Sequence, residues 1–286
     1  MKTLCIKTNN PKAINYLLDN FKKLELDDVY FSYHKFKIYN NIFIHYRGKN
    51  LENFLNTISS LLTSLVIDIY ENIITKNLLQ KEYFYFDNIE KKQILDKIDD
   101  MYLDDAKDFE TKGNILFDIF HDFLINNNKL YLKGFLTFRL KKYISELEKI
   151  VDDAVNQYLI EKEYTEFVSL LKLYVNSEES KIDLVHLVYH NEESILLDKD
   201  KNVIKTDINL LNAKFLSDIT FSSSDMVLNT LLNIVPKKIY IHLIDEEVDE
   251  FITTLELIFE NRISVCRDCN ICRIYHNFEK KGRFNS

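Results

Sequence analysis

The chain of 286 residues is 46% apolar and 29% charged, a composition that excludes an intrinsically disordered protein. Its formal net charge of −8 argues against binding to nucleic acid or to an anionic membrane surface. With only 4 Gly and 2 Pro, few positions interrupt regular structure, so we expect long helices.

The first 48 residues predict a small α/β unit. Residues 4–8 form an apolar strand, and Asn10 then caps a helix whose first residue is Pro11. A second strand is predicted at residues 29–33. Apolar residues then alternate over residues 36–44 around Asn40-Asn41, which predicts a hairpin turn at that pair.

Residues 49–178 predict a helical bundle. Apolar side chains recur at helical spacing over residues 51–69, 89–98 and 115–125, and three consecutive Asn residues at 126–128 should end the last of these helices. In residues 133–175 the spacing predicts one long helix that ends near Tyr158 and, after a short break, a second helix. Helices joined by brief polar links are typical of a bundle.

Residues 179–286 predict a second α/β unit. A hairpin is expected over residues 184–197, followed by a helix capped at Ser222 or Ser223. A strand at 237–243, a helix at 247–259 and a last strand at Ser264-Val265 complete it. The expected fold class is therefore α+β and helix-rich, with an N-terminal α/β unit, a central helical bundle and a C-terminal α/β unit that ends in a Cys-rich tail.

The sharpest chemical motif is Cys266-x2-Cys269-x2-Cys272, followed by His276. Three thiolates at this spacing can bind three irons of a [4Fe–4S] cluster, although no fourth Cys follows them. His276 could supply the fourth ligand, or Cys5 could do so through the fold. A Cys3His zinc site uses the same residues, and ordinary thiols near the end of the chain are the alternative to any metal.

The other candidate residues favour structural roles. His186 and His190 would lie about 13 Å apart on one strand, too far to bind the same metal directly, and His242 reads as a sheet residue. The acidic residues at 245–250 could hold Mg²⁺, but Asp245 as a helix cap explains them better. The basic residues at 139–142 alternate with acidic ones further along, as on an ordinary helix surface.

Standard catalytic motifs are missing from the sequence. It contains no glycine-rich phosphate loop, no G-x-S-x-G and no H-E-x-x-H, so no catalytic and no cofactor-binding residue is assigned. The N-terminal apolar run is too short for a signal peptide, and the most hydrophobic stretch, residues 61–70, falls short of a membrane span. We therefore expect a cytoplasmic protein without a transmembrane segment, in which thiols stay reduced.

One set of residues in the predicted helical bundle matches the pattern of a known family. These residues are Gly134, Phe135, Phe138, Arg139, Leu140, Tyr143, Glu146, Leu147, 150–152, Ala154, Val155, 158–164 and Phe167. In them the chain resembles the YtxC family of endospore-forming Firmicutes, whose members are grouped as sporulation proteins. The resemblance implies a role in endospore formation and transfers no catalytic residue. We expect a non-enzymatic protein that acts through a protein partner; the alternative is a metal protein, either an Fe–S redox factor or a zinc-stabilised one.

Overall fold

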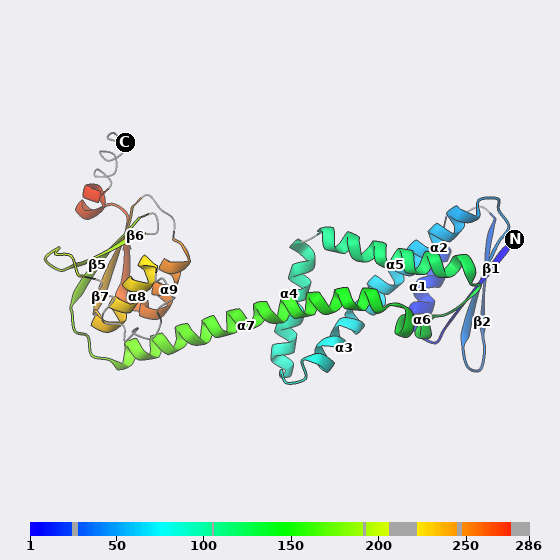
Figure 1. The fold of residues 1–286 in the computed structure, drawn as a ribbon, viewed down its shortest axis with the longest axis horizontal. Helices are drawn as coiled ribbons and strands as arrows, with labels where there is room; N and C mark the ends of the chain where they lie inside the picture. The colour runs from blue at the N-terminus through cyan, green and yellow to red at the C-terminus, as the bar shows by residue number, and fades with distance from the viewer. Residues whose placement is uncertain (25–27, 105, 191–192, 206–221, 245–247, 276–286) are drawn as a thin grey trace. The chain divides into compact units, whose positions relative to one another are not determined.

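The computed structural model describes residues 1–24, 28–104, 106–190, 193–205, 222–244 and 248–275 (Figure 1). The chain forms two compact units, Met1–Ile160 and Glu161–Ser286. Each unit contains one four-stranded mixed sheet, and helices make up most of the remaining described residues. The predicted fold class, α+β and helix-rich, is confirmed, whereas the three-part division at residues 48 and 178 stays a prediction.

The sheet of the first unit has the strand order β2-β3-β1-β4. Its strands are β1 (Lys2–Thr8), β2 (Val29–Lys35), β3 (Asn40–Tyr46) and β4 (Lys129–Tyr131). β3 lies antiparallel to β1 and β2, whereas β4 lies parallel to β1. Helix α1 (Pro11–Phe21) begins as predicted, because the side chain of Asn10 accepts hydrogen bonds from the backbone N–H groups of Lys12 and Ala13.

The helices of the first unit are α2 (Leu51–Leu65), the π-helix η1 (Val66–Glu71), α3 (Asn72–Glu82), α4 (Asn88–Asp104), α5 (Ala106–Asn126), α6 (Leu132–Arg139) and the start of α7 (Lys141–Ser177). Among the described residues, one stretch, Leu51–Glu82, is long and apolar enough to cross a membrane by length and composition alone. Core helices of soluble proteins meet the same criterion. In this stretch Phe54, Ile58 and Leu62 are fully buried in the core of the first unit.

Two predicted boundaries are wrong. The long helix breaks at Leu140, between α6 and α7, and α7 then continues for 37 residues through Tyr158 without interruption. The expected turn at Asn40-Asn41 lies inside β3, and the chain reverses before Asn40 instead. Asn41 is 8% exposed and is paired on both sides in the sheet, so packing outweighs its preference for turns.

The sheet of the second unit has the order β6-β5-β7-β8. Its strands are β5 (Leu184–His190), β6 (Glu193–Asp198), β7 (Lys238–Leu243) and β8 (Ile263–Cys266). β6 is antiparallel to β5, whereas β5, β7 and β8 run parallel to one another. The remaining elements are α8 (Ser223–Ile234), α9 (Glu250–Phe259) and a short 3-10 turn, η3 (Glu260–Arg262).

The two faces of this second sheet are covered differently. On one face Val185, Leu187, Ile239 and Ile241 pack into the larger core together with α8, α9 and the end of α7 (Figure 1). Because side chains alternate along a strand, the next residues point to the other face. That face carries a smaller cluster of buried residues: Val188, Leu197, Ile244, Ile271 and Cys272. The cysteine motif therefore packs on the sheet face opposite the helices.

Candidate metal centre

Four side chains of the second unit converge on one point. His242 lies on β7, and Cys266 is the last residue of β8, directly opposite His242 in the parallel pair. Cys269 and Cys272 follow in the turn and in the helical residues 270–275. The four ligand atoms of these residues all lie within 4.8 Å of one another, so this group could hold a metal ion.

Four of the six separations between the ligand atoms are close to those around a single tetrahedral ion, and the other two are at most 4.8 Å. Nδ1 of His242 lies 3.4 Å from Sγ of Cys269 and 3.5 Å from Sγ of Cys272. Sγ of Cys272 lies 3.7 Å from Sγ of Cys269 and 4.0 Å from Sγ of Cys266. Tetrahedral zinc, with its usual bond lengths to sulfur and nitrogen, places S and N ligands about 3.6 Å apart and two S ligands about 3.8 Å apart.

The ring of His242 is in the protonation state that a metal requires. Burial, and secondly the neighbouring His186, lower the pKa of His242 to about 4. The imidazole is therefore neutral at pH 7, with one nitrogen free of a proton and able to bind a cation.

His186 lies on the far side of His242 and orients it. Nδ1 of His186 is 2.9 Å from Nε2 of His242, and the two rings stack with their centroids 5.1 Å apart. When Nε2 of His242 carries the proton and donates it to His186, the lone pair on Nδ1 points at the thiols. In many proteins a hydrogen-bond partner on the ring nitrogen that does not bind the metal fixes the tautomer and orientation of a metal-binding histidine in this way.

The thiols differ in their surroundings. Burial alone would raise the pKa of Cys269, but hydrogen bonds with the backbone N–H of Cys272, with the thiols of Cys272 and Cys266 and with the N–H of Ile271 together hold it below its ordinary value. Cys269 stands at the start of the helical residues 270–275, where free N–H groups stabilise a thiolate. Burial raises the pKa of Cys272, and the nearby Cys269 raises it further. A cation placed between them would stabilise both thiolates.

The structure brings together three of the four predicted ligands. Cys266, Cys269 and Cys272 lie side by side, but the described fourth member is His242, which the sequence indicated only as a sheet residue. His276 lies outside the described residues. Cys5 is buried in β1 of the first unit. Whether the group binds metal stays a prediction.

The remaining candidates have ordinary partners. His190 forms a hydrogen bond with the backbone oxygen of Ile244. In the acidic run, Asp245 lies outside the described residues, and the cap of α9 is Asp249, which accepts from the N–H of Ile252. The hydroxyl of Tyr189 also donates to Asp249. These hydrogen bonds account for the positions of His190 and Asp249 without a bound cation.

Comparison with known proteins identifies the family. A family model described as "YtxC-like family" matches residues 56–264. The chain belongs to the YtxC-like family. The "Uncharacterized protein YtxC" of Bacillus subtilis (strain 168) is 24% identical over 195 residues, which are 66% of this chain and 69% of that protein. No solved structure matches. The family match includes His242 and ends two residues before Cys266.

Proposed function

We propose that the second unit of this YtxC-like protein binds one zinc ion through His242, Cys266, Cys269 and Cys272. The observation that supports this proposal is the cluster of four ligand atoms within 4.8 Å, at separations close to those of tetrahedral zinc. One nitrogen and three sulfur ligands make a donor set typical of structural zinc sites.

Zinc fits these distances better than an Fe–S cluster. In a [4Fe–4S] cluster each thiolate binds a different iron, so the sulfur atoms surround a core of eight atoms and lie far from one another. Here Sγ of Cys272 lies only 3.7 Å and 4.0 Å from the other two sulfur atoms. Ligands this close can share one ion but leave no room for a cluster between them.

The site supports a structural role rather than a catalytic one. Four protein ligands complete a tetrahedral ion, whereas catalytic zinc keeps one position open for water or substrate. The ligands come from β7, from the end of β8 and from the segment that follows it. A bound ion would therefore fasten the residues after β8 to the sheet.

Metal analysis of the full-length protein tests the proposal. After anaerobic purification we expect about one zinc per chain, no visible absorption, and loss of the metal in Cys269→Ser. Cys5→Ser removes a buried thiol of the other unit and is the matched control, which should keep its zinc. Iron with visible absorption would favour the Fe–S alternative, and absence of any bound metal would overturn the proposal.

We also propose that the protein acts in endospore formation, in the cytoplasm and through a protein partner. Membership of the YtxC-like family supports this proposal, since the family that the sequence resembles is grouped with sporulation. Deletion of the gene in its spore-forming host should reduce the number of heat-resistant spores without slowing vegetative growth. Normal spore numbers in the deletion strain would overturn it.

Complementation of that strain links the two proposals. The triple variant Cys266→Ser, Cys269→Ser, Cys272→Ser is expressed in the deletion strain. If it restores heat-resistant spores, sporulation does not require the zinc site. If it does not, sporulation requires the site. Protein levels must be measured alongside, because a structural zinc site also sets how much folded protein accumulates.

A further inference from the structure

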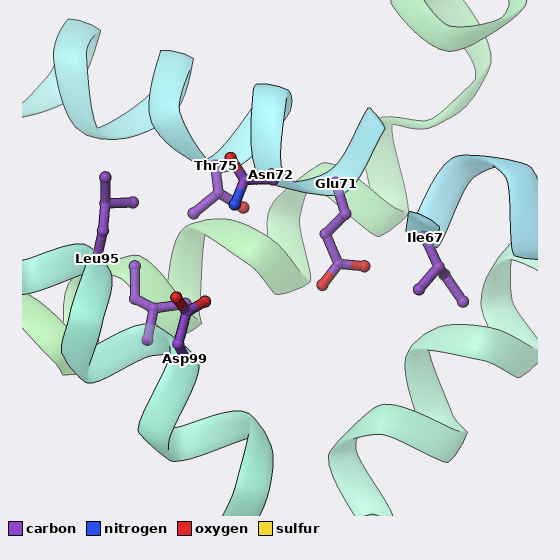
Figure 2. Close-up of a pocket in the computed structure, with 7 residues that line it drawn as sticks. Ile67, Glu71, Asn72, Thr75, Leu95 and Asp99 are labelled. Carbon is purple, nitrogen blue, oxygen red and sulfur yellow. The ribbon is translucent and has the colours of Figure 1, made fainter. Parts of the chain in front are cut away.

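A cavity in the first unit is lined by both polar and apolar side chains. Its volume is about 250 Å³, and it lies between η1, α3 and α4. Figure 2 shows Glu71, Asn72 and Thr75 on one side of this space and Asp99 facing them from α4. Ile67, Leu95 and Ile98 form the apolar part of its lining. None of these residues belongs to the candidate metal centre.

Glu71, at the end of the π-helix η1, is a buried carboxylate held by two partners. It is 7% exposed, and its Oε1 lies 3.1 Å from Nζ of Lys112, which is 3% exposed. Its Oε2 accepts a hydrogen bond from the hydroxyl of Tyr143. Burying an ion pair costs solvation free energy that the pairing often fails to recover, and π-helical turns occur frequently at functional sites. Stability alone therefore gives a poor account of this arrangement.

Thr75 is the second, independent indication of a ligand. Its side chain is 4% exposed and lines the cavity, and its Oγ1 has no hydrogen-bond partner among the residues that the structure describes. A buried hydroxyl without a partner has lost the hydrogen bonds that it makes with water in the unfolded chain, and this loss destabilises the fold. A molecule inside the cavity that donates or accepts one hydrogen bond would offset that loss.

We propose that this cavity binds a small organic cation, a primary ammonium group on a short alkyl chain. Two carboxylates line the cavity, those of the buried Glu71 and the exposed Asp99, and among the described residues one cation, Lys112, is paired with Glu71. An ammonium group offers three N–H donors, which suit Thr75 Oγ1 and the carboxylate of Asp99. The alkyl chain would lie against Ile67, Leu95 and Ile98.

The same residues suit a metal dication less well. Both carboxylate oxygens of Glu71 already have partners, and one of these, the positive Lys112, repels a dication twice as strongly as it repels a singly charged ammonium group at the same distance. Mg²⁺ and Ca²⁺ also require several oxygen ligands or retained waters around them. Three of the seven lining residues are aliphatic and offer none.

Titration of the full-length protein with n-butylammonium tests the proposal, with butyrate as the anionic control of the same length. We expect saturable binding of n-butylammonium by calorimetry and by saturation-transfer NMR, and no binding of butyrate. Thr75→Val keeps the shape of the side chain and removes the hydroxyl, and it should weaken binding about ten-fold. Asp99→Asn should weaken it by a similar factor, whereas Asp100→Asn, one residue further and outside the cavity lining, should not change it.

Three results would overturn the proposal. The first is no saturable binding of n-butylammonium, which would leave the cavity to water. The second is unchanged binding in Thr75→Val, with circular dichroism showing that the variant is folded. The third is binding of Mg²⁺, lost in Asp99→Asn, without binding of the amine, which would assign the cavity to a metal.

Discussion

Replacement of His242 by Gln distinguishes the two histidines that could complete the zinc site. Nδ1 of His242 is 3.4 Å and 3.5 Å from two of the thiols, whereas His276 was the candidate indicated by sequence spacing. We expect His242→Gln to lose most of the zinc affinity and His276→Gln to keep it. Gln is close to His in length, so the change mainly removes the ring nitrogen.

The size of the effect follows from the role of the ligand. Loss of a group that only orients a metal ligand costs about 10–100-fold in affinity, so loss of the ligand itself should cost about 100-fold or more. That factor corresponds to about 2.7 kcal/mol. For a unit the length of Glu161–Ser286, each kcal/mol shifts the Tm by about 3–5 °C. The stabilisation that saturating zinc provides should therefore shrink by about 8–14 °C.

The assay is differential scanning calorimetry of each protein with saturating zinc and with a chelator. The difference between the two Tm values reports zinc binding alone, because packing changes affect both samples. Wild type and His276→Gln should show the same difference. If His242→Gln retained the full zinc-induced shift while His276→Gln lost it, the assignment of the fourth ligand would be wrong.

Three further variants test other parts of the structure. His186→Phe keeps a stacking ring but removes the hydrogen-bond partner of His242. It should lower the zinc affinity about 10–100-fold, measured by competition with a chromophoric chelator. Unchanged affinity would show that His186 does not orient His242. Lys112→Met leaves Glu71 buried without its cation and should reduce the free energy of unfolding, measured by urea denaturation, by about 3–5 kcal/mol. The double variant Glu71→Met, Lys112→Met should recover most of that loss. A Lys112→Met variant as stable as the wild type would contradict this expectation. Ser222→Ala removes the cap of α8 and should cost about 1 kcal/mol, whereas Ser223→Ala, the neighbouring control, should cost little.

Local sequence signals predicted most elements of the fold correctly. Asn10 before Pro11 marked the start of α1, and Ser222 marked the start of α8, because each side chain satisfies N–H groups that the helix cannot. The alternating residues from Leu184 onward gave the hairpin of β5 and β6. Each of these signals involves residues within four positions of one another, so no knowledge of the fold was needed.

The wrong boundaries arose where packing decided between two acceptable local structures. The stripe of apolar residues continues past Leu140 at helical spacing, so the sequence contains no sign that the helix breaks there. At Leu140 the backbone leaves helical geometry, with φ −88° and ψ 19°, and the buried side chain still packs in the core of the first unit. Asn40 and Asn41 favour turns by themselves, but β3 pairs with strands on both sides and includes them.

His242 could not be assigned from local spacing because its partners lie on a different strand. It stands opposite Cys266 only because β7 and β8 are adjacent and parallel, with α9 between them in sequence. One signal was available: parallel strands joined by a helix place their carboxyl ends at the same edge of a sheet. A histidine near the end of one such strand and a cysteine at the end of the next are therefore brought together. His276 is nearer to the cysteines in the sequence, and spacing alone therefore indicates it instead of His242.

The unequal cover of the second sheet gives a physical reason for a metal at this place. The helix-covered face buries a large apolar cluster around Leu187, Ile241 and Leu255. Among the described residues, the opposite face has a far smaller cluster, and a buried thiol, Cys272, is one of its members. Apolar burial contributes about 25 cal/mol for each Å² removed from water, so the smaller cluster holds the residues after β8 only weakly. A zinc ion shared between β7 and that segment would supply the missing stabilisation, which is why chelation should loosen this edge of the sheet before the core beneath α8 and α9.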